Sequence, residues 1–197
     1  MFASIYSMQG GISSAAGGDF FATGGNTIAG AGVDIAHTFT ASGTFAVVAG
    51  ETAVSYLVIA GGGSGGGNYG GGGGAGGYRN SHGTTGGGGS AETPLTLGVS
   101  SNTVTIGAGG ASAQNDIGAT GSNSVFASVT ALAGGGGAMG NSASKSVGLA
   151  GGSGGGGGTT SSGDGAGGAA SSPTQGFAGG VGDTNGSSYR NAGGGGG

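Results

Sequence analysis

Residues 54–80 read VSYLVIAGGGSGGGNYGGGGGAGGYRN, and this stretch organises the chain. It opens with a short apolar run rich in β-branched and aromatic residues, which predicts a strand. Alternate side chains of a strand point to opposite faces, and here both faces are apolar, so we expect both to be buried. Glycine then takes over almost without interruption. The stretch therefore predicts a buried strand that continues directly into a polyglycine segment.

The composition restricts what can stabilise such a fold. Of the 197 residues 61 are Gly, whereas only 2 are Pro and only 6% are aromatic. Charged residues amount to 5%, which argues against a disordered chain kept solvated by charge. The chain has no strict Gly-X-Y repeat, which argues against collagen. Ordering glycine backbone costs about 1–2 kcal/mol per residue, with no side-chain burial to offset it. We therefore expect the glycine runs to adopt polyglycine II helices that stack and hydrogen-bond to one another.

Apolar segments between turn signals predict several further strands. Strands are expected at residues 37–41, 44–48 and 54–60, with a two-residue hairpin turn at Ser42-Gly43 and with Phe39 and Phe45 in the core. Residues 95–106 predict a second hairpin, whose apolar positions alternate with small or polar ones: Leu95, Leu97, Val99, Val104 and Ile106. Residues 115–122 are expected to form a turn-rich link. Residues 124–137 repeat the opening pattern, with a strand that continues into polyglycine.

The expected fold is mainly β with little or no helix, built from short antiparallel hairpins plus stacked polyglycine II helices. We divide the chain into an N-terminal arm (1–36), a β-rich and glycine-rich module (37–133) and a polyglycine-rich region with loops (134–197). Two interpretations of the arm stay open. It is either a loosely wrapped segment or a docking segment whose aromatic residues become buried on a larger assembly.

Charge and targeting signals limit the partners. The net charge is −4 and no basic patch exists, which argues against a nucleic-acid partner. Without cysteine there is no disulfide or thiolate metal site. The N-terminus lacks the pattern of a signal peptide, and no apolar run approaches the roughly 20 residues of a membrane span. We expect a protein that is made in a cytoplasm, does not span a membrane and is soluble or assembled there.

The sequence predicts no catalytic residue, no cofactor and no metal, so we do not expect an enzyme. The many G-x-G-x-x-G matches lack the following helix of a dinucleotide site, and the only lysine, Lys145, lies outside a phosphate-binding motif. His37 and His82 are isolated and are expected to be ordinary polar positions. The seven acids are scattered, without a local pair suited to acid/base chemistry.

One short motif occurs twice, as Gly-Tyr-Arg-Asn at residues 77–80 and Ser-Tyr-Arg-Asn at residues 188–191. The two copies hold two of the three cations of the chain. In a structural interpretation Tyr lies over glycine backbone and Arg caps carbonyl groups. In a functional one both copies lie at loop tips and contact a surface glycan or protein, because Tyr and Arg are common hot-spot residues. The candidate receptor-binding residues are Tyr69, Tyr78, Arg79, Asn80, His82, Tyr189, Arg190 and Asn191.

Five segments in this order resemble the glycine-rich modules of tailed-bacteriophage tail-fibre and adhesin proteins. The segments are HTFTASGTFAV (37–47), VSYLVIAGGGSGGG (54–67), GGGGAGGYR (71–79), NTVTIGAGG (102–110) and GSNSVFASVTALAGGGG (121–137). The resemblance implies a virion component near the host-facing end of a fibre or tail, with loops between glycine runs presented to a bacterial receptor. It implies no catalytic residue, and the first 36 residues lie outside it.

We therefore expect a bacteriophage structural protein of tail-fibre or adhesin type, present in several copies or as a homo-oligomer. Its partners would be other virion proteins of the fibre, tail or capsid, and a bacterial surface glycan or outer-membrane protein. One alternative is a capsid decoration or spacer without a receptor. A further alternative is an ice-binding polyglycine bundle, although the irregular threonines argue against it, and absence of thermal hysteresis would exclude it.

Overall fold

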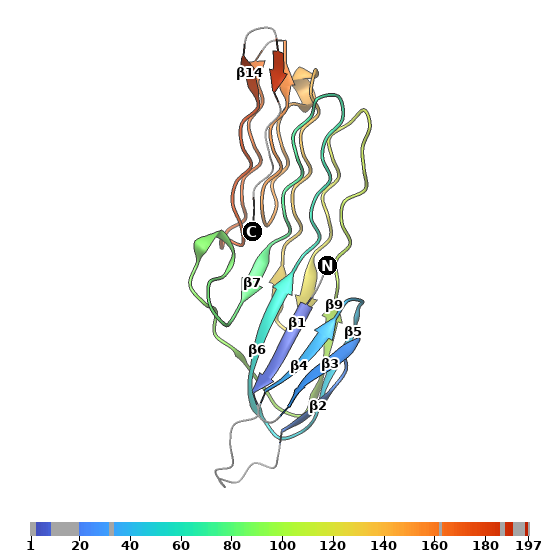
Figure 1. The fold of residues 1–197 in the computed structure, drawn as a ribbon, viewed down its shortest axis with the longest axis vertical. Helices are drawn as coiled ribbons and strands as arrows, with labels where there is room; N and C mark the ends of the chain where they lie inside the picture. Colours follow the sequence, from blue (N-terminus) through green and yellow to red (C-terminus); the bar gives the residue numbers. More distant parts are fainter. Residues whose placement is uncertain are drawn as a thin grey trace.

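The structure, a computed structural model, describes residues 3–8, 20–31, 34–161, 163–185, 188–190 and 196. It is elongated, with a β-sandwich at one end and a bundle of extended segments that continue from its strands (Figure 1). Within the described residues the helical turns are two short 3₁₀ turns, η1 (Gly86–Gly88) and η2 (Ala143–Lys145). The predicted mainly-β fold with little or no helix is confirmed.

Two antiparallel sheets form the sandwich. The first has the order β3 (Thr27–Ala31), β4 (Asp34–Phe39), β1 (Ala3–Met8), β6 (Thr52–Ile59) and β7 (Tyr78–Asn80), and β8 (Leu95–Leu97) also pairs with β6. The second has the order β11 (Val129–Ala131), β10 (Ser124–Phe126), β9 (Ser100–Thr105), β5 (Gly43–Ala49) and β2 (Phe21–Thr23). Two small hairpins, β12 (Thr159–Thr160) with β13 (Gly163–Asp164) and β14 (Asp183–Asn185) with β15 (Ser188–Arg190), lie elsewhere.

The core lies between the two sheets and is built from few large side chains. Phe39 and Phe45, the predicted core residues, are 2% and 0% exposed. The Phe45 ring meets His37 and Phe126 edge-on, with centroids 5.1 and 5.7 Å apart. The expectation that His37 is an ordinary polar position is wrong. It is fully buried inside β4, where its Nδ1 lies 2.8 Å from the carbonyl oxygen of Gly24.

Both predicted hairpins are wrong in their pairing, although the strands exist. β4 and β5 lie in different sheets, so Ser42-Gly43 passes between sheets rather than closing a hairpin. β8 and β9 are likewise separated, and Val99 between them is 70% exposed instead of buried. The reason is that better partners come from elsewhere: β4 pairs with β1 and β3, and β5 pairs with β2 and β9. The boundary expected between the N-terminal arm and the β-rich module, at residue 37, falls inside β4.

The strand predicted from residue 124 is in fact a tight hairpin, β10 and β11. Its turn contains Ala127 with a φ of 50°, a conformation that Gly or Asn adopts more readily. Because Ala-Ser is a weak turn signal, no local pattern predicted this reversal. The continuation into polyglycine after β11 is as predicted.

The second part of the molecule is the polyglycine bundle, formed by residues 60–77, 107–122 and 132–182. Its neighbouring segments are joined by backbone hydrogen bonds that recur at every third residue. One series runs between antiparallel segments, where the N–H groups of Gly61, Ser64 and Gly67 donate to Ser122, Ala119 and Asp116 at 2.9, 2.9 and 3.0 Å. Another runs between parallel segments, where Gly134, Gly137 and Gly140 donate to Gly61, Ser64 and Gly67 at 2.7, 2.9 and 3.1 Å.

A step of three residues is the repeat of the polyproline II helix, so the predicted stacked polyglycine II helices are confirmed. Of residues 115–122, expected to form a turn-rich link, residues 115–116 do lie in a turn, whereas residues 117–122 instead supply one of these helices. Each helix carries no internal hydrogen bonds, and its backbone groups are satisfied by its neighbours instead. The bundle therefore replaces a side-chain core with a hydrogen-bonded network of backbone.

Residues 132–140 form the centre of the bundle. This segment exchanges hydrogen bonds with segments on several sides, including Gly74 N–H to Gly135 O at 2.8 Å and Leu149 N–H to Gly136 O at 2.9 Å. Residues 134–138 are buried. A Cβ added to Gly136 would overlap the carbonyl group of Gly118, because the two backbones touch. Glycine is required here by close approach and not by backbone torsion.

Candidate functional site

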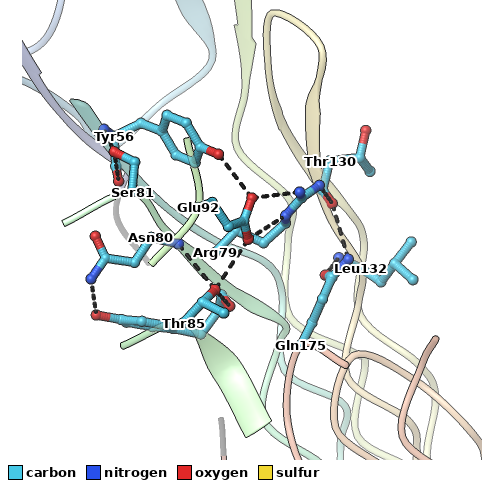
Figure 2. A network of polar contacts seen from close by, with 10 residues as sticks. Tyr56, Arg79, Asn80, Ser81, Thr85, Glu92, Thr130, Leu132 and Gln175 are labelled. Atoms are coloured by element: carbon cyan, nitrogen blue, oxygen red, sulfur yellow. Dashed lines mark hydrogen bonds and ion pairs between the residues drawn. The ribbon is translucent and has the colours of Figure 1, made fainter. Parts of the chain in front are cut away.

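The first copy of the repeated motif lies at the junction between the sandwich and the bundle. Tyr78, Arg79 and Asn80 form β7, which pairs with β6, and all three are half-buried. Figure 2 shows their side chains in a polar network with residues from distant parts of the chain. This copy is therefore not at a loop tip, and it does not present Arg79 to a partner in the way that the functional interpretation expected.

Arg79 is held by a carboxylate from the loop that follows β7. Its Nη2 and Nε donate to Oε2 and Oε1 of Glu92 at 2.5 and 2.9 Å, which is a two-point ion pair. The same carboxylate accepts hydrogen bonds from the Tyr56 hydroxyl at 2.8 Å and from the Thr85 hydroxyl at 3.1 Å. Glu92 therefore links β6, β7 and the loop between β7 and β8 in one network (Figure 2).

The network also reaches the polyglycine bundle. Arg79 Nη1 donates to the carbonyl oxygen of Thr130 at 3.3 Å, and Gln175 Nε2 donates to the same oxygen at 3.3 Å. Gln175 is 4% exposed, and its Oε1 accepts from the Leu132 N–H at 2.8 Å. Arg79 caps a carbonyl group, as the structural interpretation expected, but that carbonyl belongs to a strand rather than to a glycine run. The side chains of Arg79 and Gln175 thus join the two parts of the molecule.

The burial and hydrogen bonding of this network shift its titrations. Burial, followed by the hydrogen bond to Glu92, raises the pKa of Tyr56 to about 12. Burial alone would raise the pKa of Glu92, but the hydrogen bonds from Arg79 and Tyr56 outweigh it and lower that pKa below its usual value. The network therefore favours a neutral tyrosine beside an ionised carboxylate and a charged guanidinium.

Stability is expected to fall at both ends of the pH range. An unfolded Glu takes up its proton near pH 4.3 and folded Glu92 only at lower pH, so unfolding gains protons and stability declines as the pH drops through this window. Unfolded Tyr loses its proton near pH 10 and folded Tyr56 near 12, so stability also declines as the pH rises above about 10. Urea unfolding from pH 3 to 11 measures both limbs.

Glu92→Gln tests whether Glu92 causes the loss of stability at acid pH, which we call the acid limb. At pH 7 it should lower the free energy of unfolding by roughly 1–3 kcal/mol, because Arg79 and Tyr56 lose a charged acceptor. It should also flatten the acid limb. Asp116→Asn is the control, since the Asp116–Lys145 ion pair is exposed and should contribute little. An acid limb unchanged in Glu92→Gln would contradict the role given to Glu92.

Asn80 shapes the loop after β7. Its side-chain Nδ2 donates to the carbonyl oxygen of His82 at 2.7 Å, and its Oδ1 accepts from the His82 N–H at 2.9 Å. His82 itself is exposed. Asn80 therefore has a structural role in the chain, whereas the His82 side chain lies at the surface of a fixed turn.

Tyr69 lies far from this junction, at the opposite end of the bundle. We call this surface the distal end and define it by the turns at residues 67–70, 112–116 and 140–146 and by residues 159–161 and 163–164. Tyr69 is 65% exposed in a turn where Asn68 and Tyr69 both have positive φ, 50° and 57°. The turns touch one another: Gly140 lies against the backbone of residues 68 and 69, and Asn141 N–H donates to Thr159 O at 2.7 Å.

The distal end is polar and nearly neutral. Its ion pair joins Lys145 Nζ to Asp116 Oδ1 at 2.9 Å, and the hydrogen bond to Lys145 lowers the pKa of that carboxyl group. Hydroxyl and amide side chains accompany this pair in the adjoining turns. The arrangement presents hydrogen-bonding groups and one tyrosine ring on a surface held by backbone contacts.

The second copy of the motif gives less information. Ser188, Tyr189 and Arg190 form β15, which pairs with β14, but the side chains of Tyr189 and Arg190 are outside the described part of the structure, as is Asn191 entirely. Sequence reasoning missed Glu92 and Gln175. No local signal could have found them, because their partners lie 13 and 43–45 residues away in the chain.

Two further findings concern metal-ligating side chains and membrane-spanning helices in the described residues. They contain no group of three or more His, Asp or Glu side chains arranged to hold a metal ion. No helix among them has the length and apolar character to cross a membrane.

Comparison with known proteins gives one result. A family model described as a glycine-rich domain matches residues 38–197, which includes most of the sandwich and the whole polyglycine bundle. No curated protein and no solved structure matches. Because the model covers most of the chain, this protein belongs to the glycine-rich domain family.

Proposed function

We propose that the chain is a non-enzymatic bacteriophage virion protein of tail-fibre or adhesin type whose distal end contacts the bacterial surface. The observation that carries the proposal is the separation of roles along the molecule. The polyglycine bundle has little freedom to vary, because its backbones touch, whereas the turns of the distal end carry polar side chains. Such a scaffold holds a binding surface away from the sandwich.

The conformation of Tyr69 supports the same assignment. A non-glycine residue in the left-handed region costs about 1–2 kcal/mol relative to its ordinary conformations. This chain, which uses glycine at 61 positions, nevertheless places a tyrosine with φ 57° at an exposed turn. Strain held at an exposed position favours a role in binding over a role in folding. Among the candidates we therefore assign receptor contact to Tyr69 and structural roles to Arg79 and Asn80.

Binding of the purified protein to host cells tests the proposal. Tyr69→Ala should weaken binding at least ~10-fold, the loss typical of an exposed aromatic hot spot, while the fold is kept. His82→Ala is the matched control, because His82 is also an exposed ring but lies in the turn directly after β7, in the first sheet of the sandwich. Equal binding by the wild type and Tyr69→Ala would exclude this site.

A wild-type protein that assembles onto particles but binds no cells would instead favour the decoration or spacer function. In that case the distal turns would serve only to connect the polyglycine helices. Particle assembly and cell binding are therefore measured on the same preparation.

A further inference from the structure

The N-terminal strand occupies an unexpected place in the first sheet. β1 lies between β4 and β6 and pairs with both in antiparallel register, with Ser4 opposite Thr38 on one side and opposite Leu57 on the other. Without β1, the backbone of β6 from Val54 to Val58 would lose its partner on this edge. β4 and β6 are joined in one sheet only through β1. Residues 3–8 therefore lie in the interior of this sheet and not at its edge.

The family match does not include β1, although β1 lies inside the first sheet. The glycine-rich domain begins at residue 38, so β1, β2, β3 and all of β4 except Thr38 and Phe39 lie outside it. Two of these strands cover edges of the family domain: β1 pairs with β6 in one sheet, and β2 pairs with β5 in the other. The domain thus has an open edge on each sheet, which this chain closes with residues from its own N-terminal part.

We infer that the gap between β4 and β6 is a strand-acceptor site, and that the β1 strand of a second copy of this chain fills it by exchange. An exchanged β1 makes the same ladder of hydrogen bonds that it makes in its own chain, so exchange loses no contact. Because β1 precedes all the other strands in the chain, it can leave and enter such a gap without displacing the strands that follow it. The second copy is the occupant because it carries the sequence and register that the gap is seen to accept.

The length of the connection permits the exchange. Residues 9–19 join β1 to the following part of the chain, contain four glycines and no proline, and can reach at most about 40 Å when extended. β1 itself, at six residues, is roughly 20 Å long. When extended, the connection is therefore about twice as long as β1. On a particle that holds several copies, proximity would favour exchange over the closed monomer.

Engineered cysteines in the full-length chain test the exchange, since the natural sequence has none. Ser4→Cys is introduced in one chain and Leu57→Cys in a second chain that carries an affinity tag, and the two are co-expressed and oxidised. Directly opposed residues of neighbouring strands are close enough for a disulfide. Exchange predicts a disulfide-linked heterodimer at twice the monomer mass on a non-reducing gel. Ser4→Cys with Thr38→Cys tests the other side of the gap.

The controls make the outcome decisive. Ser4→Cys co-expressed with Val48→Cys should give no heterodimer above background, because Val48 is exposed but lies in the other sheet. A single chain with Ser4→Cys and Leu57→Cys reports β1 in its own gap, as a disulfide within the monomer. The inference is overturned if only this internal disulfide forms, or if both mixed pairs fail to exceed the Val48→Cys control. Neither readout depends on cell binding, so failure here would leave the proposed function standing.

Discussion

Gly136→Ala is expected to destabilise the protein by at least about 3 kcal/mol, although it adds only one methyl group. The new Cβ would overlap the Gly118 carbonyl group, which belongs to a neighbouring polyglycine helix and not to a flexible side chain. To make room, the segments 117–122 and 132–140 must separate, and hydrogen bonds between them such as Gly118 N–H to Gly137 O at 2.8 Å would be lost. Urea unfolding and the thermal midpoint measure the effect.

Gly65→Ala is the matched control within the same bundle. A Cβ at this exposed position would lie 3.5 Å from the Gly71 carbonyl oxygen, which is ordinary contact, and its φ lies outside the left-handed region. The substitution should be neutral or stabilise the fold by about 0.4–1 kcal/mol, because alanine reduces the freedom of the unfolded chain. Equal effects of the two substitutions would show that close backbone packing does not hold the bundle together.

The second large effect is expected in the sandwich, where Phe45→Ala should cost about 3–5 kcal/mol. Phe45 is 0% exposed and meets the rings of His37 and Phe126 edge-on. A core with so few aromatic side chains has little else to fill the cavity. Calorimetry should show a lowered unfolding temperature for the sandwich.

Val48→Ala is the control on the same strand. Val48 is 53% exposed, so its truncation should change the free energy of unfolding by less than about 0.5 kcal/mol. A Phe45→Ala variant as stable as Val48→Ala would mean that the polyglycine bundle alone sets the measured stability.

The sequence predicted the kinds of elements better than their partners. The apolar run at β6 and the glycine run after it indicate a strand and a polyglycine II helix through local physics, and both are present. Pairing depends on distant residues. β1 lies inside the first sheet and pairs with β4, which therefore does not form the hairpin that Ser42-Gly43 predicted. Ala127 closes a turn without a turn residue, which no local rule anticipates.

For the candidate site as well, the sequence indicated the local motif but not the distant residues that contact it. The repeat of Tyr-Arg-Asn was visible in the sequence, but whether Arg79 faced solvent depended on Glu92 and on the Thr130 carbonyl, which only the fold brings to it. Tyr69 was visible as an interruption of a glycine run. Its position beside Gly140 at the distal end follows from the stacking of the polyglycine helices, and not from any local pattern.

The three-residue repeat of the backbone hydrogen bonds determines which changes of chain length the molecule can accept. A single glycine inserted into one helix would move every following N–H group by one residue. These groups would then no longer face the carbonyl groups that accept their hydrogen bonds on the neighbouring helices. Three inserted residues restore the phase and lengthen a helix by about 9 Å, one polyproline II turn. Where such triplets are added to adjoining segments together, the bundle grows by whole turns while the contacts at the β7 junction are unchanged. The length of the glycine runs should therefore vary among related chains in steps of three residues. The length of the turns at the distal end is not restricted in this way.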